Sequence, residues 1–173
     1  MITIISATNR PDCNTLKVAK NYASLMEKHG VHPLLLSLET LPMEIYSPEI
    51  YTKKPESFEK ILNEFIIPAQ KFVFISPEYN GSFPGILKVF LDAMPYNLNR
   101  NKKAALIGVS TGRAGNLRGM DHLSSVLNFC GLFVHPMQIP ISSVLQQMDE
   151  SGALTDANTL KVLNRQIEEF SKW

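Results

Sequence analysis

The sequence predicts one doubly wound α/β domain, in which helices cover both faces of a parallel β-sheet. Short apolar segments alternate five times with longer segments whose apolar residues recur at helical spacing. The apolar segments, such as residues 72–75, do not alternate with polar residues, as is typical of strands that are buried on both faces. A chain of 173 residues suits a single domain with a substantial core, and we expect that domain to span residues 1–173.

The expected elements follow one another along the chain. Strands are expected at residues 2–6, 31–38, 72–75, 104–110 and 133–139, and helices at residues 14–29, 58–68, 85–94, 116–129 and 155–171. Gly30 ends the first helix in the position that glycine commonly takes after a last turn. Residues 41–57 form a long connection rich in proline, tyrosine and glutamate, and connections of that length often carry function.

Composition excludes several classes of function. Apolar residues make up 45% of the chain and the formal net charge is +1, which favours neither a disordered chain nor a nucleic-acid partner. No apolar run approaches the length of a membrane span, so we expect no membrane partner. Cys13 and Cys130 lie far apart, so we expect a cytoplasmic chain with reduced thiols. The histidines are scattered, so we expect no metal site.

The loop after the first strand is typical of a phosphate site. Hydroxyl and amide side chains and one arginine gather there at the start of a helix, in Thr8, Arg10, Cys13, Asn14 and Thr15. Helix N-termini and arginine both favour an anion. The alternative is that Asn14 or Thr15 only caps the helix. Neither a GxGxxG nor a GxxxxGK[ST] motif occurs, which argues against a dinucleotide or nucleoside triphosphate site.

The loop after the third strand combines a tyrosine with free backbone amides. It consists of Pro77, Glu78, Tyr79, Asn80 and Gly81. Pro77 ends the strand and Gly81 permits a sharp bend, so the amides can face a flat heteroaromatic ring beside Tyr79. The alternative is an ordinary turn with a surface tyrosine. Right-handed crossovers would place this loop on the same sheet edge as the first one, where parallel sheets bind ligands.

The loop after the fourth strand begins Ser110-Thr111-Gly112 and contains two further glycines. Its glycines either allow close approach of a ligand or only punctuate the chain. Residues 108–112 also match GxSxG, the nucleophile turn of serine hydrolases, with His122 and His135 downstream. A hydrolase is disfavoured because the chain is short for that fold, no HGGG-like oxyanion segment occurs, and the other two loops would stay unexplained.

Together these segments resemble the NADPH-dependent FMN reductase family, a flavodoxin-like group that includes quinone, azo-dye and chromate reductases. The motif Pro77-Glu78-Tyr79-Asn80-Gly81-Ser82, followed by Pro84-Gly85, is the most specific, and the resemblance covers essentially the whole chain. It implies a five-stranded sheet of order 2-1-3-4-5, bound FMN, NADPH or NADH as co-substrate, and a homodimer or homotetramer. Thr8 and Cys13 stand where the family commonly has serine, and Val89 and Ala93 replace an asparagine and a tryptophan.

The resemblance also implies roles for individual residues. The FMN phosphate would lie on Thr8, Arg10, Asn14 and Thr15, with the amide of Cys13. The isoalloxazine would lie against Pro77, Glu78, Tyr79, Asn80 and Gly81, and its pyrimidine side would approach Ser110, Thr111 and Gly112. We expect no catalytic acid or base from the protein, because the flavin carries the chemistry.

The expected reaction is ping-pong transfer of hydride from NAD(P)H through FMN to a small acceptor such as a quinone, azo compound, free flavin or metal oxyanion. The main alternative is a non-enzymatic FMN electron carrier of flavodoxin type. The balanced charge of the chain, with Arg113 and Arg118 in the third loop, argues against such a carrier. A flavodoxin-like module used only for binding or assembly is a further alternative.

Overall fold

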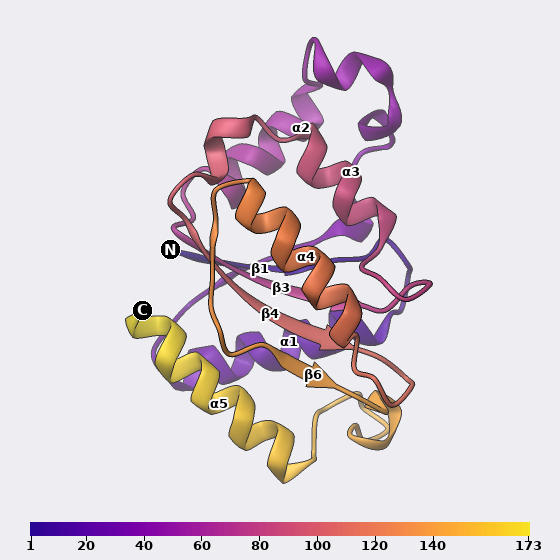
Figure 1. The fold of residues 1–173 in the computed structure, drawn as a ribbon, viewed down its shortest axis with the longest axis vertical. Coiled ribbons are helices and arrows are strands. Elements are labelled where there is room, and N and C mark those ends of the chain that lie inside the picture. Colours follow the sequence, from indigo (N-terminus) through magenta and orange to yellow (C-terminus); the bar gives the residue numbers. More distant parts are fainter.

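A parallel sheet forms the centre of the computed structural model, which describes residues 1–173 (Figure 1). Its strands are β1 (Ile2–Ser6), β2 (Leu34–Ser37), β3 (Lys71–Pro77), β4 (Lys103–Val109), β5 (Phe133–Val134) and β6 (Ile139–Ile141). They pair in the order β2-β1-β3-β4-β5, and β6 also pairs with β4. All pairs are parallel. The predicted fold class and strand order are therefore confirmed.

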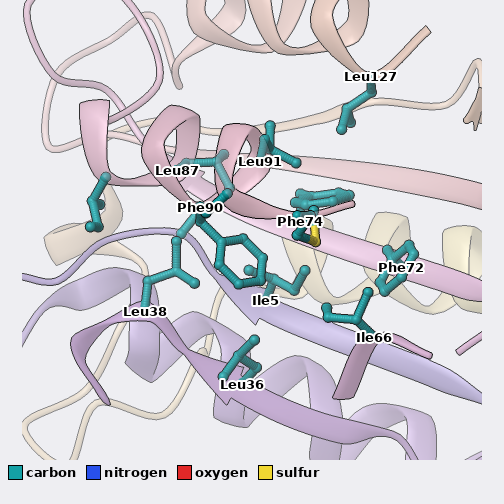
Figure 2. Packing of buried hydrophobic residues seen from close by; sticks show 14 of the residues in the cluster. Ile5, Leu36, Leu38, Ile66, Phe72, Phe74, Leu87, Phe90, Leu91 and Leu127 are labelled. Carbon is teal, nitrogen blue, oxygen red and sulfur yellow. The ribbon is translucent and has the colours of Figure 1, made fainter. Parts of the chain in front are cut away.

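Helices cover both faces of the sheet. Helices α1 (Asn14–Lys28) and α5 (Ala157–Lys172) pack on one face, and α2 (Glu56–Ile61), α3 (Gly85–Ala93) and α4 (Leu117–Phe129) pack on the other. Figure 2 shows the core on the α3 side, where Leu87 and Phe90 of α3 lie over Ile5 and Phe74 of the sheet. Within the chain, no helix combines the length and the apolar character that crossing a membrane requires.

The prediction of one continuous strand at residues 133–139 is wrong. Lys103 pairs with Phe133 and Ile107 with Ile139, so a step of four residues on β4 matches a step of six on its neighbour. The two extra residues bulge out of the sheet around Pro136, which has no N–H to donate. The buried side chain of Gln166 from α5 fills the gap, since its Nε2 donates to the carbonyl oxygens of Met137 (2.7 Å) and Leu106 (3.3 Å).

The connection between β2 and α2 is more structured than the sequence suggested. It contains three 3₁₀ turns, Leu38–Thr40, Met43–Tyr46 and Pro48–Tyr51. Ile45 and Ile50 are buried in the core, and burying them favours a defined conformation. The helix expected at residues 58–68 instead begins at Glu56 and widens into a π-helical turn over Leu62–Ile66.

The stability of the protein is expected to depend on pH through Lys102, which lies just before β4. Its Nζ donates to the carbonyl oxygen of Ile66 at 2.7 Å, and burial lowers the pKa of Lys102. A lowered lysine pKa means that the unfolded chain binds more protons between the folded pKa and 10.5, so stability rises with pH in that window. We therefore expect the free energy of unfolding to rise in wild type relative to Lys102→Met as pH approaches 10.5.

Urea denaturation at neutral pH and at about pH 10, close to the ordinary lysine pKa, measures this difference. Lys161→Met, which removes an exposed lysine, controls for the change in net charge. A difference between wild type and Lys102→Met that does not change with pH would contradict the expectation.

Candidate functional site

The carboxyl ends of four strands meet at one edge of the sheet. Ser6 pairs with Ile75, Pro77 with Val109, and Val109 with Ile141, so the loops that follow β1, β3, β4 and β6 start side by side. A cavity of about 490 Å³ lies among these loops. It is lined by Arg10, Pro11, Asp12, Cys13, Asn14, Thr15, Pro77, Glu78, Tyr79, Val109, Ser110, Thr111 and Val144. The sequence prediction that three loops converge agrees with this geometry.

The loop after β1 presents unpaired hydrogen-bond donors at the start of α1. The N–H groups of residues 12–15 find no acceptor in the protein, and Arg10 takes part in no ion pair. Cys13 caps the helix, with its Sγ accepting from the N–H of Leu16 at 3.3 Å. The alternative that Asn14 or Thr15 caps this helix is therefore wrong. Unpaired N–H groups at a helix N-terminus next to an arginine favour an anion.

The loop after β3 is a tight turn. Asn80 and Gly81 both have positive φ, 52° and 76°. Tyr79 and Ser82 exchange backbone hydrogen bonds of 2.9 and 3.1 Å across the turn. An Asn-Gly pair suits this geometry because both residues tolerate left-handed backbone angles. The N–H groups of Asn80 and Gly81 have no acceptor in the protein, so this turn carries two free donors at its tip.

Thr8 links the first two loops instead of facing the cavity. Its side chain is fully buried, and its Oγ1 shares a hydrogen bond of 2.8 Å with the hydroxyl group of Tyr79. The same oxygen accepts from the N–H of Arg10 at 3.2 Å. Thr8 therefore holds Tyr79 and the backbone of Arg10 in place, and a direct phosphate contact from its side chain would require these bonds to change.

The glycines of the loop after β4 and of the first turn of α4 differ in their roles. Gly115 has a φ of 57°, and a Cβ there would lie 2.6 Å from Pro140. A Cβ on Gly119 would lie 2.0 Å from the Oδ1 of Asn116. Both glycines are thus required by packing within the protein. Gly112 is open, because the nearest atom to a Cβ built there is Ser110 Oγ at 3.4 Å.

Asn116 is a residue that the sequence analysis missed. Its side chain is fully buried, and its Nδ2 donates to the carbonyl oxygens of Ser76 (2.9 Å) and Pro77 (3.0 Å). It thereby fixes the start of α4 to the end of β3. The only signal in the sequence was an asparagine that follows a glycine. Asn116 has a φ of 64°, a backbone angle that asparagine tolerates better than most residues.

The structure brings most of the thirteen predicted site residues to the cavity. Nine of them line it, and the exceptions are Thr8, Asn80, Gly81 and Gly112. Pro11, Asp12, Val109 and Val144 also line the cavity and were not predicted. Val144 could not be inferred because it follows β6, a short strand that was not expected beyond residue 139.

The arrangement of the histidines argues against a serine hydrolase. Ser110 Oγ accepts from the N–H of Gly112 at 3.0 Å. His122 instead pairs with Ser82, its Nδ1 lying 2.9 Å from the serine Oγ. His135 is buried against Phe170 and Trp173. No histidine is hydrogen-bonded to Ser110, so the GxSxG match does not correspond to a catalytic triad.

A parallel sheet of this order, with a cavity at its carboxyl edge, defines a flavodoxin-like α/β protein. The sequence profile described as NADPH-dependent FMN reductase matches residues 1–146. An NAD(P)H-dependent FMN reductase of Pseudomonas aeruginosa is 32% identical over 163 residues, which cover 88% of this chain and 86% of that protein. The chain therefore belongs to the NADPH-dependent FMN reductase family, an oxidoreductase family that uses NAD(P)H and FMN. The expected family and cofactors are confirmed.

Two further proteins show the range of the similarity. A quinone reductase of Pseudomonas putida is 26% identical over 179 residues, covering 99% of this chain and 93% of its own. The solved structure of FerB, an NAD(P)H:(acceptor) oxidoreductase of Paracoccus denitrificans, has a TM-score of 0.82 and 27% identity, with 99% of this chain and 94% of that chain covered. A flavodoxin of Megasphaera elsdenii shares the fold alone. Its TM-score is 0.61 at 13% identity, with 98% of this chain and 99% of that chain covered. The relatives thus favour a reductase over an electron carrier.

Proposed function

We propose that the cavity at the carboxyl edge holds FMN and that the protein, as a single domain spanning residues 1–173, reduces quinones or similar small acceptors with NAD(P)H. The observation that supports this most directly is the set of unpaired N–H groups at residues 12–15 beside Arg10, in a cavity shared with Tyr79. A phosphate matches those donors, and a flat heteroaromatic ring suits the wall formed by the loop after β3. The donor set therefore fits a phosphorylated flavin.

Each loop would contact a different part of the cofactor. Arg10 and the N–H groups of Cys13, Asn14 and Thr15 would hold the phosphate, and Pro77, Glu78 and Tyr79 would lie against the ring. Ser110, Thr111 and Gly112 would border its pyrimidine side. Asn80 and Gly81 lie at the tip of the turn with free N–H groups. Thr8 would act indirectly, by holding Tyr79 through their shared hydrogen bond.

Bound FMN would supply the redox chemistry, accepting a hydride from NAD(P)H and passing electrons to the acceptor. The protein would contribute binding, orientation and preorganised donors, and we assign no catalytic acid or base to its side chains. Nicotinamide and acceptor would use the same open side of the cavity in turn, which implies ping-pong kinetics. Parallel double-reciprocal plots at several quinone concentrations are expected, and intersecting plots would contradict this mechanism.

The identity of the bound cofactor is tested by the visible spectrum of the purified protein and by titration with FMN. We expect a flavin spectrum and one FMN per chain. Consumption of NADPH is then compared with a quinone, an azo dye, free FMN and chromate as acceptors. The names of the relatives favour the quinone as the fastest of these. A protein that binds no FMN when FMN is in excess would overturn the proposal.

Arg113 and Arg118 are candidates for recognising the 2′-phosphate of NADPH. Arg118 lies over the turn after β3, since a Cβ on Gly81 would meet its Nη1 at 2.9 Å. Arg113 is exposed in the loop after β4. Replacing both with alanine is expected to reduce the ratio of kcat/KM for NADPH to that for NADH by about tenfold, the effect of one charge-assisted contact. Arg165→Ala, far away on α5, is the control, and an unchanged ratio in the double variant would contradict the assignment.

Association into a homodimer or homotetramer is part of the proposal. Helix α3 carries the large apolar side chains Phe90 and Leu91, which suit a subunit contact only if they are exposed. Both are buried within the chain, at 0% and 5% exposure, so a subunit contact would have to use other residues. Sedimentation velocity over a range of protein concentrations tests this point, and a monomer at every concentration would exclude both assemblies.

A further inference from the structure

A second cavity lies at the opposite edge of the sheet from the proposed FMN cavity. It opens between the carboxyl ends of α3 and α4 and the 3₁₀ turn Tyr96–Asn99, and its volume is about 430 Å³. Both helices run back from the carboxyl edge of the strands, so their ends lie far from the loops described above (Figure 1). The two cavities have no lining residue in common.

Asn99 gives this cavity a polar floor. The residue is only 4% exposed; the N–H of Lys102 donates to its backbone carbonyl oxygen, and its side-chain amide makes no hydrogen bond within the protein. Both polar atoms of the amide keep some accessible surface, which the cavity that Asn99 lines provides. Only water or a ligand in the cavity can pair with this amide, so a ligand that displaces the water needs a polar atom at that point.

The walls of the cavity are apolar and partly aromatic. Leu91 and Met94 of the α3 end and Val126 of α4 form the walls. Two aromatic side chains stand at the mouth with large exposed fractions, Phe129 at 80% and Tyr96 at 60%. Exposed aromatic side chains beside a cavity are typical of sites that bind flat apolar molecules, because stacking buries both partners.

The charges at the rim favour a neutral ligand. Lys88 and Asp92 form an ion pair of 2.8 Å and so neutralise each other. Both side chains are about half exposed, at 48% and 45%. A concave, mostly apolar lining with one nearly buried polar group is the usual form of a small-molecule site.

We propose that this cavity is a second small-molecule site, which binds a neutral aromatic compound bearing one hydroxyl or carbonyl group. The ring lies among Leu91, Met94 and Val126 with Phe129 and Tyr96 beside it, and the polar group bonds to the amide of Asn99. This proposal is independent of what the cavity at the carboxyl edge binds.

Alkylation of Cys130, which also lines the cavity, reports on occupancy. The full-length protein is saturated with FMN and treated with iodoacetamide, with and without 2-naphthol, a neutral hydroxylated aromatic probe. Modification of each cysteine is followed by mass spectrometry of its peptide. We expect 2-naphthol to slow modification of Cys130 in a saturable manner and to leave Cys13, in the other cavity, unchanged. Absence of protection at Cys130 would overturn the proposal.

Asn99→Leu tests the polar contact, because leucine resembles asparagine in shape but cannot form the hydrogen bond. It is expected to weaken protection by 2-naphthol about fivefold to tenfold. Val126→Phe, which fills the cavity, is expected to abolish protection and provides a second test if Asn99→Leu does not fold. Ser125→Ala at the rim is the matched control with unchanged protection. Equal affinity in Asn99→Leu and wild type would overturn the assignment of Asn99.

A second copy of the chain is the competing occupant, and the same assay detects it. If another copy covers the cavity, Cys130 becomes protected as the protein concentration rises, without any probe. That outcome would overturn the proposal of a small-molecule site.

Discussion

Replacing Gly108 by alanine is expected to destabilise the protein by about 3 kcal/mol, at the upper end of the effects of overpacking. A Cβ at this position would lie 2.2 Å from the carbonyl oxygen of Gly115 and 3.1 Å from Met120 Cε. The obstacle is backbone, so it cannot turn away as a flexible side chain would. Gly115 cannot easily move aside, because it has a φ of 57° and Pro140 packs directly against it. Strand β4 and the loop that follows it must therefore separate.

Urea denaturation followed by circular dichroism measures the change in the free energy of unfolding. Gly85→Ala is the matched control, because a Cβ there has no neighbour within 4 Å and the residue begins helix α3. That control is expected to be neutral or more stable by up to about 1 kcal/mol, the difference in helix propensity. A Gly108→Ala protein as stable as wild type would show that the loop after β4 can shift without loss.

Replacing Arg10 by alanine is expected to weaken the binding of FMN by about tenfold. The residue supplies the only positive charge among those that line the cavity. A hydrogen bond to a charged group contributes about 1.5–3 kcal/mol, and solvent reduces this for a side chain as exposed as Arg10. Arg10→Lys should bind FMN with intermediate affinity, because lysine keeps the charge but loses the planar fork that matches phosphate.

Quenching of FMN fluorescence on titration with apoprotein gives the dissociation constants. The difference between Arg10→Ala and wild type should shrink as salt is added, because exposed charges are screened. Arg165→Ala removes an arginine on α5 and should leave the affinity unchanged. If Arg10→Ala retained FMN as well as wild type, the phosphate would have to bind elsewhere in the cavity.

Local sequence patterns anticipated much of the fold. Strand β1 lies where it was expected, at Ile2–Ser6, because a short run of apolar, β-favouring residues has few other stable conformations. The turn at Asn80–Gly81 was foreseen in part, because glycine adopts a positive φ without strain. The convergence of three loops followed from chain direction alone, since parallel strands with right-handed crossovers present their carboxyl ends at one edge.

Features that depend on contacts between distant segments could not be anticipated. The break between β5 and β6 is stabilised by Gln166, which lies more than twenty residues later in the chain, on α5. Thr8 was expected to face a phosphate, but its hydrogen bond to Tyr79 places it behind the cavity wall. Asn116 holds two loops together through carbonyl groups of β3 that precede it by about forty residues.

The residues of this protein thus specify where the chain is a strand, a helix or a tight turn, because those preferences act over a few neighbouring positions. They also specify which loops carry donors for an anion. Which donors remain unpaired, and which side chains face a cavity, was decided only when the helices packed on the sheet. Hydrogen bonds and burial across the fold select one partner for each polar group, and no short segment contains that information.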